Sequence, residues 1–230
     1  MYKIIKRLFD FVMALLALTV LSPLLIPVII GLLLTGEHYV FYFQERIGKG
    51  GKPFDIWKFA TMLKNSPNIG TGTVTTRNDP RVLPMGKFLR KTKINELPQL
   101  INILIGNMSI IGPRPLVKKT YDLYADDVKE CISKVTPGLS GIGSVIFRDE
   151  EYYVSKAKDP VEFARQYIQP QKGELEKWYY HNCSLYVDFM IIFLTCWVIV
   201  FPKSDLVYKV FKTLPRLDLE KDVETFNANN

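Results

Sequence analysis

Glu96 and Asn95 are the two side chains in this sequence best suited to chemistry on a phosphate group. They stand at the start of a predicted helix in which Leu97, Leu100 and Leu104 recur at helical spacing. We expect Asn95 to cap the amino end of that helix. A helix amino terminus presents unpaired N–H groups and the positive end of the helix dipole, and both favour bound anions. Glu96 then supplies a carboxylate beside a predicted phosphate site.

Two arginines lie near this pair in the sequence. Arg90 is shortly upstream, and Arg114 is held between Pro113 and Pro115. Rigidly held guanidinium groups suit bidentate binding of phosphate. Each residue also has a plainer interpretation, with Glu96 as a surface charge and the arginines as ordinary surface residues. Residue type alone leaves that alternative open.

The composition narrows the classes of function. The chain has 230 residues, a formal net charge of +7 and 48% hydrophobic residues. This charge suits phosphate-bearing substrates or an anionic membrane surface. No nucleic acid partner is predicted, because the basic residues form no known nucleic-acid motif. The three cysteines lack metal-ligand spacing and favour a reducing compartment, and two histidines argue against a zinc site or a histidine-based triad.

The amino-terminal part is almost wholly apolar from Phe11 to Leu34. A straight helix of that length would reach roughly 36 Å, enough to cross the hydrocarbon core of a membrane. Ser22 and Pro23 interrupt it, and we expect Ser22 to bond back to a carbonyl that the proline leaves free. The segment is therefore either a kinked spanning helix or a re-entrant hairpin that enters and leaves one leaflet.

Charges flank this segment on both sides: Lys3, Lys6 and Arg7 before it, and Arg46, Lys49 and Lys52 after it. Positive flanks favour the cytoplasmic side of a membrane. This pattern fits two cytoplasmic ends better than it fits a crossing, but by itself it does not decide between the two alternatives.

The rest of the chain has a mixed pattern. Aromatic and β-branched residues predict short strands over 39–44 and 54–59. The apolar run 189–201 is too short to span a membrane and predicts a buried or interfacial helix. We therefore predict a membrane segment over 1–36, one membrane-associated domain over 37–216, and a polar tail over 217–230.

Motifs along residues 3–148 resemble, in their order, those of the bacterial sugar transferases, which are monotopic phosphoglycosyl transferases. The run comprises Gln44-Glu45-Arg46-Ile47-Gly48, the stretch from Lys52 through Lys58 to Phe59, Asp79-Pro80-Arg81, Gly86 to Lys91, Asn95 to Pro115, and Pro137 to Gly141. Arg148 matches a further arginine of the family. The order of these motifs is far more specific than any single one.

The resemblance implies a fold and a location. It implies a mixed, helix-rich α/β monotopic membrane protein with a small cytoplasmic catalytic domain and interfacial helices. The break at Ser22 and Pro23 resembles that of the family's re-entrant membrane helix, and this favours the hairpin over the spanning helix. The implied location is the bacterial inner membrane, with the catalytic domain facing the cytoplasm and with a homodimer left open.

The resemblance also implies a reaction. A sugar 1-phosphate passes from a UDP-sugar to a polyprenyl phosphate, usually undecaprenyl phosphate, as the first step of surface polysaccharide or glycoconjugate synthesis. UMP leaves, and Mg²⁺ is the cofactor. The implied catalytic pair is Asn95 and Glu96, with Glu96 also the metal ligand. The implied substrate-binding residues are Lys58, Arg90, Pro113, Arg114, Pro115 and Arg148.

Four departures from the family pattern bear on activity. Asn95 replaces the aspartate that attacks phosphorus, and a neutral amide does not readily form an acyl phosphate. Asn107 replaces an aspartate, Ala60 replaces an arginine, and Gly141 to Val145 differ from the usual run. Three accounts remain: Glu96 is the nucleophile, the lipid phosphate attacks directly, or the chain is a silenced relative that binds nucleotide sugar or a partner enzyme. A membrane-anchored structural protein with accidental motifs is the rival from another class.

Overall fold

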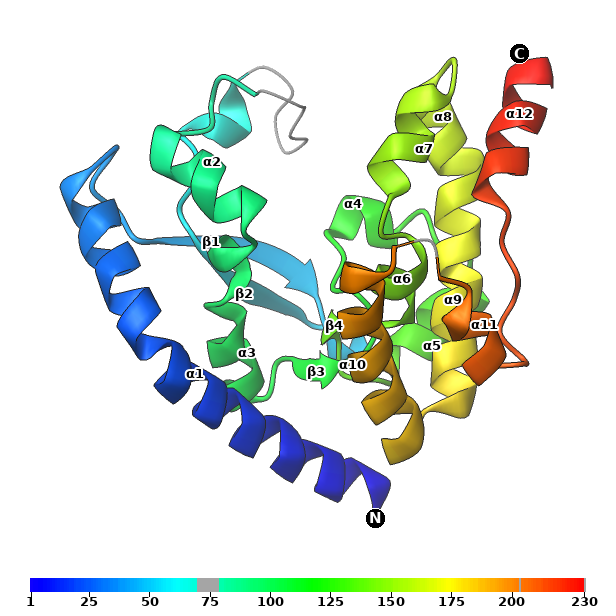
Figure 1. The fold of residues 1–230 in the computed structure, drawn as a ribbon, viewed down its shortest axis with the longest axis horizontal. Helices are drawn as coiled ribbons and strands as arrows, with labels where there is room; N and C mark the ends of the chain where they lie inside the picture. Colours follow the sequence, from blue (N-terminus) through cyan, green and yellow to red (C-terminus); the bar gives the residue numbers. More distant parts are fainter. Residues whose placement is uncertain (70–78, 203, 230) are drawn as a thin grey trace. The chain divides into compact units, whose positions relative to one another are not determined.

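The computed structural model describes residues 1–69, 79–202 and 204–229. Helices predominate over short strands (Figure 1), which confirms the mixed, helix-rich α/β class. The first elements are α1 (Tyr2–Leu34), β1 (Phe41–Ile47), η1 (Lys49–Gly51), β2 (Pro53–Phe59), η2 (Ser66–Asn68), α2 (Pro84–Lys91), η3 (Ile94–Glu96), α3 (Gln99–Ile105) and β3 (Ser109–Ile111). They are followed by α4 (Lys118–Tyr121), α5 (Asp126–Ser133), β4 (Gly138–Ser140), α6 (Ile142–Ile146), α7 (Glu150–Lys156), α8 (Pro160–Phe163), the π-helical turn η4 (Ala164–Ile168), α9 (Gln169–Asn182), α10 (Leu185–Val200), α11 (Leu206–Val210) and α12 (Leu219–Asn229).

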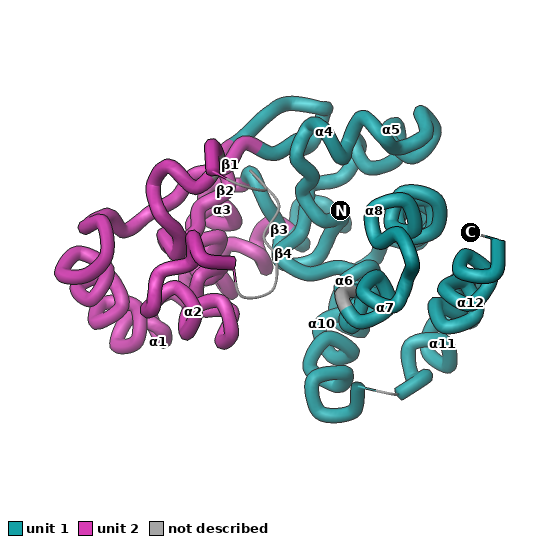
Figure 2. The backbone as a smooth tube through the Cα atoms, turned by 90° about the horizontal axis from the view of Figure 1, so that it is seen from above, with its two compact units in different colours: residues 1–6, 46–54, 107–230 teal, residues 7–45, 55–106 magenta. Residues whose placement is uncertain are grey.

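The chain forms two compact units, and each is assembled from separate stretches of sequence (Figure 2). The first unit comprises residues 1–6, 46–54 and 107–230, and the second comprises residues 7–45 and 55–106. Each unit has its own cluster of buried apolar side chains. The predicted boundaries at residues 36 and 216 concern membrane attachment and the tail, and they stay predictions.

Helix α1 keeps helical backbone through both of its prolines. Its 33 residues are long and apolar enough to cross a membrane by length and composition. Pro23 cannot donate the hydrogen bond that Thr19 O would normally accept. The Ser22 hydroxyl donates to that carbonyl instead, at 2.8 Å, which confirms the predicted role of Ser22. The re-entrant course of the segment through a membrane stays a prediction.

The second unit packs α1 and α2 around the end of the β1–β2 sheet. Leu25, Val28 and Leu32 of α1 bury their side chains with Phe59 of β2 and Leu89 of α2. The two strands begin and end within three residues of the predicted positions 39–44 and 54–59. This core holds the end of β2 against the helices that follow it in the chain.

Close packing of α2 depends on Gly86. A Cβ atom at this position would lie 2.1 Å from the carbonyl oxygen of Thr61. Only glycine therefore allows α2 to approach the backbone that continues from β2. The consequence is that α2 is seated directly on the segment that follows β2.

The first unit is built around a short parallel sheet and the long helices α9 and α10. Ser109 of β3 lies opposite Gly138 of β4, and Ile111 lies opposite Ser140. Buried side chains from α6, α9, α10, α11 and α12 form its core, including Leu175, Ile191 and Phe226. The sheet is too small to be an independent core, so helix packing supplies most of the buried apolar surface in this unit.

Helix α10 is the apolar run that the sequence predicted to be buried or interfacial. It buries one face, which includes Ile191 and Leu194, and confirms a partly buried helix. Asp188 is buried on that face and accepts hydrogen bonds from Tyr179 at 2.7 Å, from Tyr2 at 2.8 Å and from Lys6 at 2.8 Å. A carboxylate this well paired is tolerated inside an apolar helix.

The segment predicted as a polar tail forms helix α12 up to Asn229. Leu219, Val223 and Phe226 follow helical spacing and are all buried. Phe226 packs edge-on against Phe163, with 5.5 Å between ring centroids. Three apolar residues on one face are enough to hold this otherwise polar helix on the first unit.

Single-cysteine labelling tests the predicted course of α1. In a variant without Cys131, Cys183 and Cys196, we expect Ile4→Cys and Lys49→Cys to react with a membrane-impermeant reagent from the cytoplasmic side alone. Positive charges on both flanks are the physical reason. Adding Pro23→Leu should restore the missing hydrogen bond and favour crossing. Periplasmic labelling at one of the two positions without that change would establish a spanning helix.

Candidate active site

Glu96 and Lys58 form an ion pair at the surface of the second unit. Lys58 lies on β2 and Glu96 ends the turn η3. Lys58 Nζ is 3.6 Å from Glu96 Oε1, and the two side chains are 17% and 25% exposed. Partial exposure leaves the carboxylate reachable from solvent. The structure therefore brings together two of the residues predicted from the sequence.

Asn95 lies beside Glu96 but does not cap a helix, so the predicted N-cap is wrong. Lys93 adopts a left-handed backbone conformation with φ of 60°, and residues Ile94–Glu96 then form a 3-10 turn. The helix α3 starts only at Gln99. Asn95 is buried, and its Oδ1 has no hydrogen-bond partner among the described residues. An unpaired buried oxygen costs free energy, and such positions are often functional.

Asn102 fixes the helix that follows this turn. Its side chain is fully buried, with Oδ1 accepting from the backbone N–H of Trp57 at 2.9 Å. Its Nδ2 donates to the carbonyl of Asp55 at 2.7 Å. The carboxamide thus bonds to β2 as a neighbouring strand would. Sequence reasoning missed this residue, although a polar side chain among the apolar positions of α3 was a visible signal.

Arg7 holds the other end of α3. Its guanidinium donates to the carbonyls of Ile103 at 2.5 Å and Leu104 at 2.6 Å. These carbonyls lie in the last turn of the helix, where positive charge is favoured. Ile103 O also accepts from the N–H of Gly106 at 3.1 Å. The sequence indicated Arg7 only as a charge that flanks the membrane segment. Its contact with α3 was not predicted.

Arg90 is a half-buried cation with neutral contacts. Its Nε donates to Thr61 Oγ1 at 2.8 Å, and Nη2 lies 3.0 Å from Met62 Sδ. No carboxylate forms an ion pair with it in the part of the chain that the structure describes. Burial lowers the pKa of Arg90, although an arginine remains charged. A buried cation without a carboxylate partner suits an anionic ligand.

Arg81 differs from Arg90 in its contacts. Its guanidinium makes a two-point ion pair with Asp79, at 2.8 Å and 2.5 Å, and donates to the carbonyls of Ser66 and Ile69. Both charged residues are buried. This motif residue therefore stabilises the loop before α2 and is not a candidate for phosphate binding.

Four other predicted residues belong to the first unit. Pro113 and Pro115 are buried, whereas the side chains of Arg114 and Arg148 are exposed. The Pro113 carbonyl accepts from the N–H of Gly138 at 2.8 Å, which ties this segment to β4. The prolines thus fix the backbone at Arg114 as predicted. The role of these residues in binding stays a prediction.

Glu176 is buried beneath Arg114. Its Oε1 accepts a long hydrogen bond, 3.4 Å, from the backbone N–H of Arg114, and Oε2 has no partner among the described residues. Burial raises the pKa of Glu176 to about 8, against the opposing effect of that hydrogen bond. The sequence gave no reason to single out this glutamate, because nothing marks a buried carboxyl group within a charged helix.

The donor set around η3 can be tested against a divalent cation. No three His, Cys, Asp or Glu side chains cluster anywhere in the described ranges. Mg²⁺ commonly binds through one or two carboxylates together with substrate phosphates. Glu96 meets that requirement, and the unpaired Oδ1 of Asn95 is a second oxygen donor on the same turn. These residues fit an ion that a bound diphosphate would share.

Comparison with known proteins gives a consistent set of relatives. The family model for bacterial sugar transferase matches residues 1–202. The UDP-glucose:undecaprenyl-phosphate glucose-1-phosphate transferase of Escherichia coli is 37% identical, over 84% of this chain and 39% of its own length. The exopolysaccharide production protein ExoY of Sinorhizobium fredii is 36% identical over 83% of each chain. The undecaprenyl-phosphate galactose phosphotransferase of Salmonella typhimurium is 31% identical, over 86% of this chain and 41% of its own length.

The buried carboxyl of Glu176 predicts a pH-dependent stability. Its pKa is raised from 4.5 to about 8, so the folded protein retains a proton that the unfolded chain loses. The contribution of Glu176 to stability should be greatest below pH 4.5 and should fall as the pH rises toward 8. The loss between pH 4 and pH 7 should be about 3 kcal/mol.

Glu176→Gln, which stays neutral, should flatten this dependence in urea denaturation measured from pH 5 to pH 8. Glu174→Gln changes an exposed glutamate of the same helix and serves as the matched control. Equal pH slopes in the wild type and in Glu176→Gln would show that Glu176 is ionised in the folded protein.

Proposed function

This chain belongs to the bacterial sugar transferase family, and from that premise we propose that it transfers a sugar 1-phosphate from a UDP-sugar to undecaprenyl phosphate. UMP is the leaving group, and the lipid-linked product starts the assembly of a surface polysaccharide. The relatives differ in the sugar that their names state, so the proposal concerns the class of UDP-sugars. The match to ExoY over most of both chains supports an activity within a chain of this length.

The observation that carries this proposal is the group of charges around η3. Lys58 pairs with Glu96, and the half-buried Arg90 has no carboxylate partner among the described residues. A UDP-sugar brings two adjacent phosphates, whose charge must be neutralised before an anion can attack. Arg90 binds an oxygen of a substrate phosphate, Lys58 pairs with Glu96, and Mg²⁺, when bound, neutralises further phosphate charge.

Two routes of phosphoryl transfer are compatible with a neutral Asn95. In the first, a carboxylate oxygen of Glu96 forms a bond to the sugar-bearing phosphorus, and UMP leaves with the electrons of the broken P–O bond. An oxygen of the lipid phosphate then displaces the carboxylate. In the second, the lipid phosphate oxygen attacks that phosphorus directly and expels UMP in one step. We propose that the protein is active and that Glu96 is indispensable in either route.

The proposed location follows from α1. From Arg7 onward, this apolar helix of membrane-spanning length belongs to the same unit as Glu96. A site at the cytoplasmic face of the inner membrane would allow a soluble nucleotide sugar to meet an embedded lipid phosphate. We propose a re-entrant course for α1 on that basis, and a homodimer stays a prediction of the family resemblance.

Asn95 favours a second candidate function, that of a silenced relative. Its buried amide cannot accept the phosphoryl group as an aspartate would. Such a protein would keep the nucleotide-sugar site and bind UDP-sugar or a partner enzyme without releasing UMP. The two candidates differ in one readout, which is UMP release from purified protein with Mg²⁺, undecaprenyl phosphate and a panel of UDP-sugars.

Arginine substitutions test the proposed phosphate contacts. Arg90→Ala, Arg114→Ala and Arg148→Ala should each weaken transition-state or ground-state binding by about 1.5–3 kcal/mol, the scale of a hydrogen bond to a charged group. Lys87→Ala removes an exposed charge from the same helix as Arg90 and should have little effect. UMP release gives the readout, after thermal melting has shown that each variant is folded. Wild-type rates in all three variants would remove the proposal.

Substitutions of the central pair test the catalytic assignment. Glu96→Gln should abolish UMP release, because it removes the ionisable member of the pair. Asn95→Asp should leave the fold unchanged, since the two side chains have nearly the same shape. Intact mass spectrometry after incubation with a UDP-sugar then separates the routes. A phosphosugar adduct on Glu96 indicates the two-step route, and UMP release without an adduct indicates direct attack.

The same pair of variants can also contradict the active assignment. If the wild type releases no UMP from any UDP-sugar and Asn95→Asp gains activity, the chain is a silenced relative. UMP release by Glu96→Gln at the wild-type rate would show instead that Glu96 has no catalytic part.

A further inference from the structure

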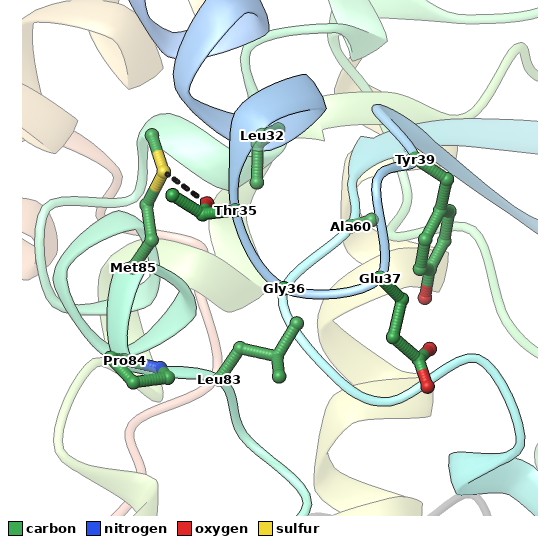
Figure 3. A pocket seen from close by; sticks show the side chains of 9 residues that line it. All are labelled: Leu32, Thr35, Gly36, Glu37, Tyr39, Ala60, Leu83, Pro84 and Met85. Carbon is green, nitrogen blue, oxygen red and sulfur yellow. Dashed lines mark hydrogen bonds between the residues drawn. The ribbon is translucent and has the colours of Figure 1, made fainter.

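An apolar pocket opens at the carboxyl end of α1, within the second unit (Figure 3). Its volume is about 230 Å³. Leu32 and Ala60 are its most buried lining residues, and Thr35, Gly36 and Glu37 are exposed at its rim. The full lining is Leu32, Thr35, Gly36, Glu37, Tyr39, Ala60, Leu83, Pro84 and Met85.

Two features of the sequence create this space. Gly36 ends α1 with φ of 62°, so the chain turns sharply away from the helix and toward β1. Ala60 presents only a methyl group at the buried end of the lining. A longer side chain at this position would occupy volume that is open here. The turn at Gly36 and the small side chain of Ala60 thus leave room for the pocket.

The polar groups of the lining already have partners. The Thr35 hydroxyl donates to Gly31 O at 2.6 Å, and the Tyr39 hydroxyl donates to Met62 O at 2.8 Å. The Glu37 carboxylate accepts from the backbone N–H of Lys64. What remains for a ligand is hydrocarbon surface from Leu32, Leu83 and Met85. A polar ligand would lose its hydration without compensation, whereas an apolar chain gains about 25 cal/mol for each Å² removed from water.

The surroundings indicate the origin of such a chain. The pocket adjoins the last turns of the one helix, among the described residues, that is apolar enough and long enough to enter a membrane, and Ile30, Leu33 and Leu34 near it are exposed. A hydrocarbon chain can therefore pass from a bilayer into the pocket along an apolar surface. This position distinguishes the pocket from a site for a water-soluble metabolite.

The pocket is also next to the cation of the candidate site. Ala60 is adjacent in the chain to Thr61, whose hydroxyl accepts from Arg90. Met62 contacts Arg90 through its sulfur and Tyr39 through its carbonyl. Consecutive Cα atoms are only about 3.8 Å apart, so the pocket and Arg90 are close enough for one ligand to reach both. Its hydrocarbon part would lie in the pocket and its phosphate at Arg90. An amphiphile with a phosphate at one end has that arrangement.

We propose that this pocket binds the isoprene units nearest the phosphate of the polyprenyl acceptor, while Arg90 binds the phosphate itself. The proposal rests on the proposed function for the identity of the lipid. An engineered cavity of about 150 Å³ accepts benzene, so a pocket of about 230 Å³ accommodates a short branched segment and not the whole chain. The remainder of the polyprenyl chain stays in the membrane.

Photo-crosslinking tests the proposal on the full-length protein in lipid nanodiscs. The probe is a polyprenyl phosphate with a diazirine in the isoprene units nearest its phosphate. After irradiation and digestion, mass spectrometry should find label on the peptides that contain Leu32–Tyr39 or Leu83–Met85. A second set of nanodiscs carries the diazirine in the acyl chains of phosphatidylglycerol. UMP release is measured separately on the same preparation.

Two variants fill the pocket from opposite sides. Ala60→Leu adds volume at its buried end, and Leu83→Trp adds it from a partly exposed wall. Each should reduce labelling of the pocket peptides at least tenfold. In an active preparation, each should also raise the KM for polyprenyl phosphate and leave the KM for the UDP-sugar unchanged. Ala17→Leu makes the same change on α1 outside the pocket and should keep the wild-type labelling.

The outcomes separate this proposal from the proposed function. If the polyprenyl probe labels the pocket and the filled variants lose this label, the proposal is supported, even if no UMP is released. In that case only the transferase assignment fails. Absence of label from both pocket peptides in the wild type overturns it. Equal labelling by the phosphatidylglycerol probe would assign the pocket to bulk phospholipid and would also overturn it.

Discussion

The two hydrogen bonds of the Asn102 carboxamide are the constraint on which the candidate site depends. They replace a missing neighbour strand along β2, so α3 is held at one register relative to Trp57 and Asp55. Lys58 follows directly on that strand, and Glu96 ends the turn that leads into α3. The 3.6 Å contact between their charges is therefore set by a neutral, fully buried amide. Lys58 and Glu96 are thus aligned by a neutral group, and neither charge is needed to hold α3 against β2.

Among the described residues of this unit, the Oδ1 of Asn95 has no hydrogen-bond partner and Arg90 forms no ion pair with a carboxylate. Both are costly in an isolated folded chain, because buried polar groups normally have partners. Arg81 shows the alternative nearby, with a guanidinium whose donors are occupied by Asp79 and backbone carbonyls. The donors of Arg81 are thus occupied within the loop, whereas Arg90 has neutral contacts and is the arginine that we propose for phosphate binding.

Sequence reasoning found the parts whose signal is local. The apolar run predicted α1, aromatic and β-branched residues predicted β1 and β2, and the order of the motifs indicated the family. It failed where the deciding contact lies far along the chain. Asn95 does not cap a helix because Lys93 turns the backbone, and nothing local marks that turn. Asn102 acquires its role from a strand 45 residues earlier. Helix α12 is held in place because Phe226 packs into the core of the first unit. The mostly polar sequence of this segment gave no sign of that contact.

Arg7 sets an order of events during synthesis. It caps the end of α3 through carbonyls that lie 96 and 97 residues later in the chain. A ribosome adding 5–20 residues per second separates the two by roughly 5 to 20 s, whereas a helix forms within microseconds. On that schedule α1 is folded before α3 leaves the ribosome. The last turn of α3 is then completed against a helix that has already formed, and in the membrane-bound state that we propose for α1 this helix would already lie in lipid.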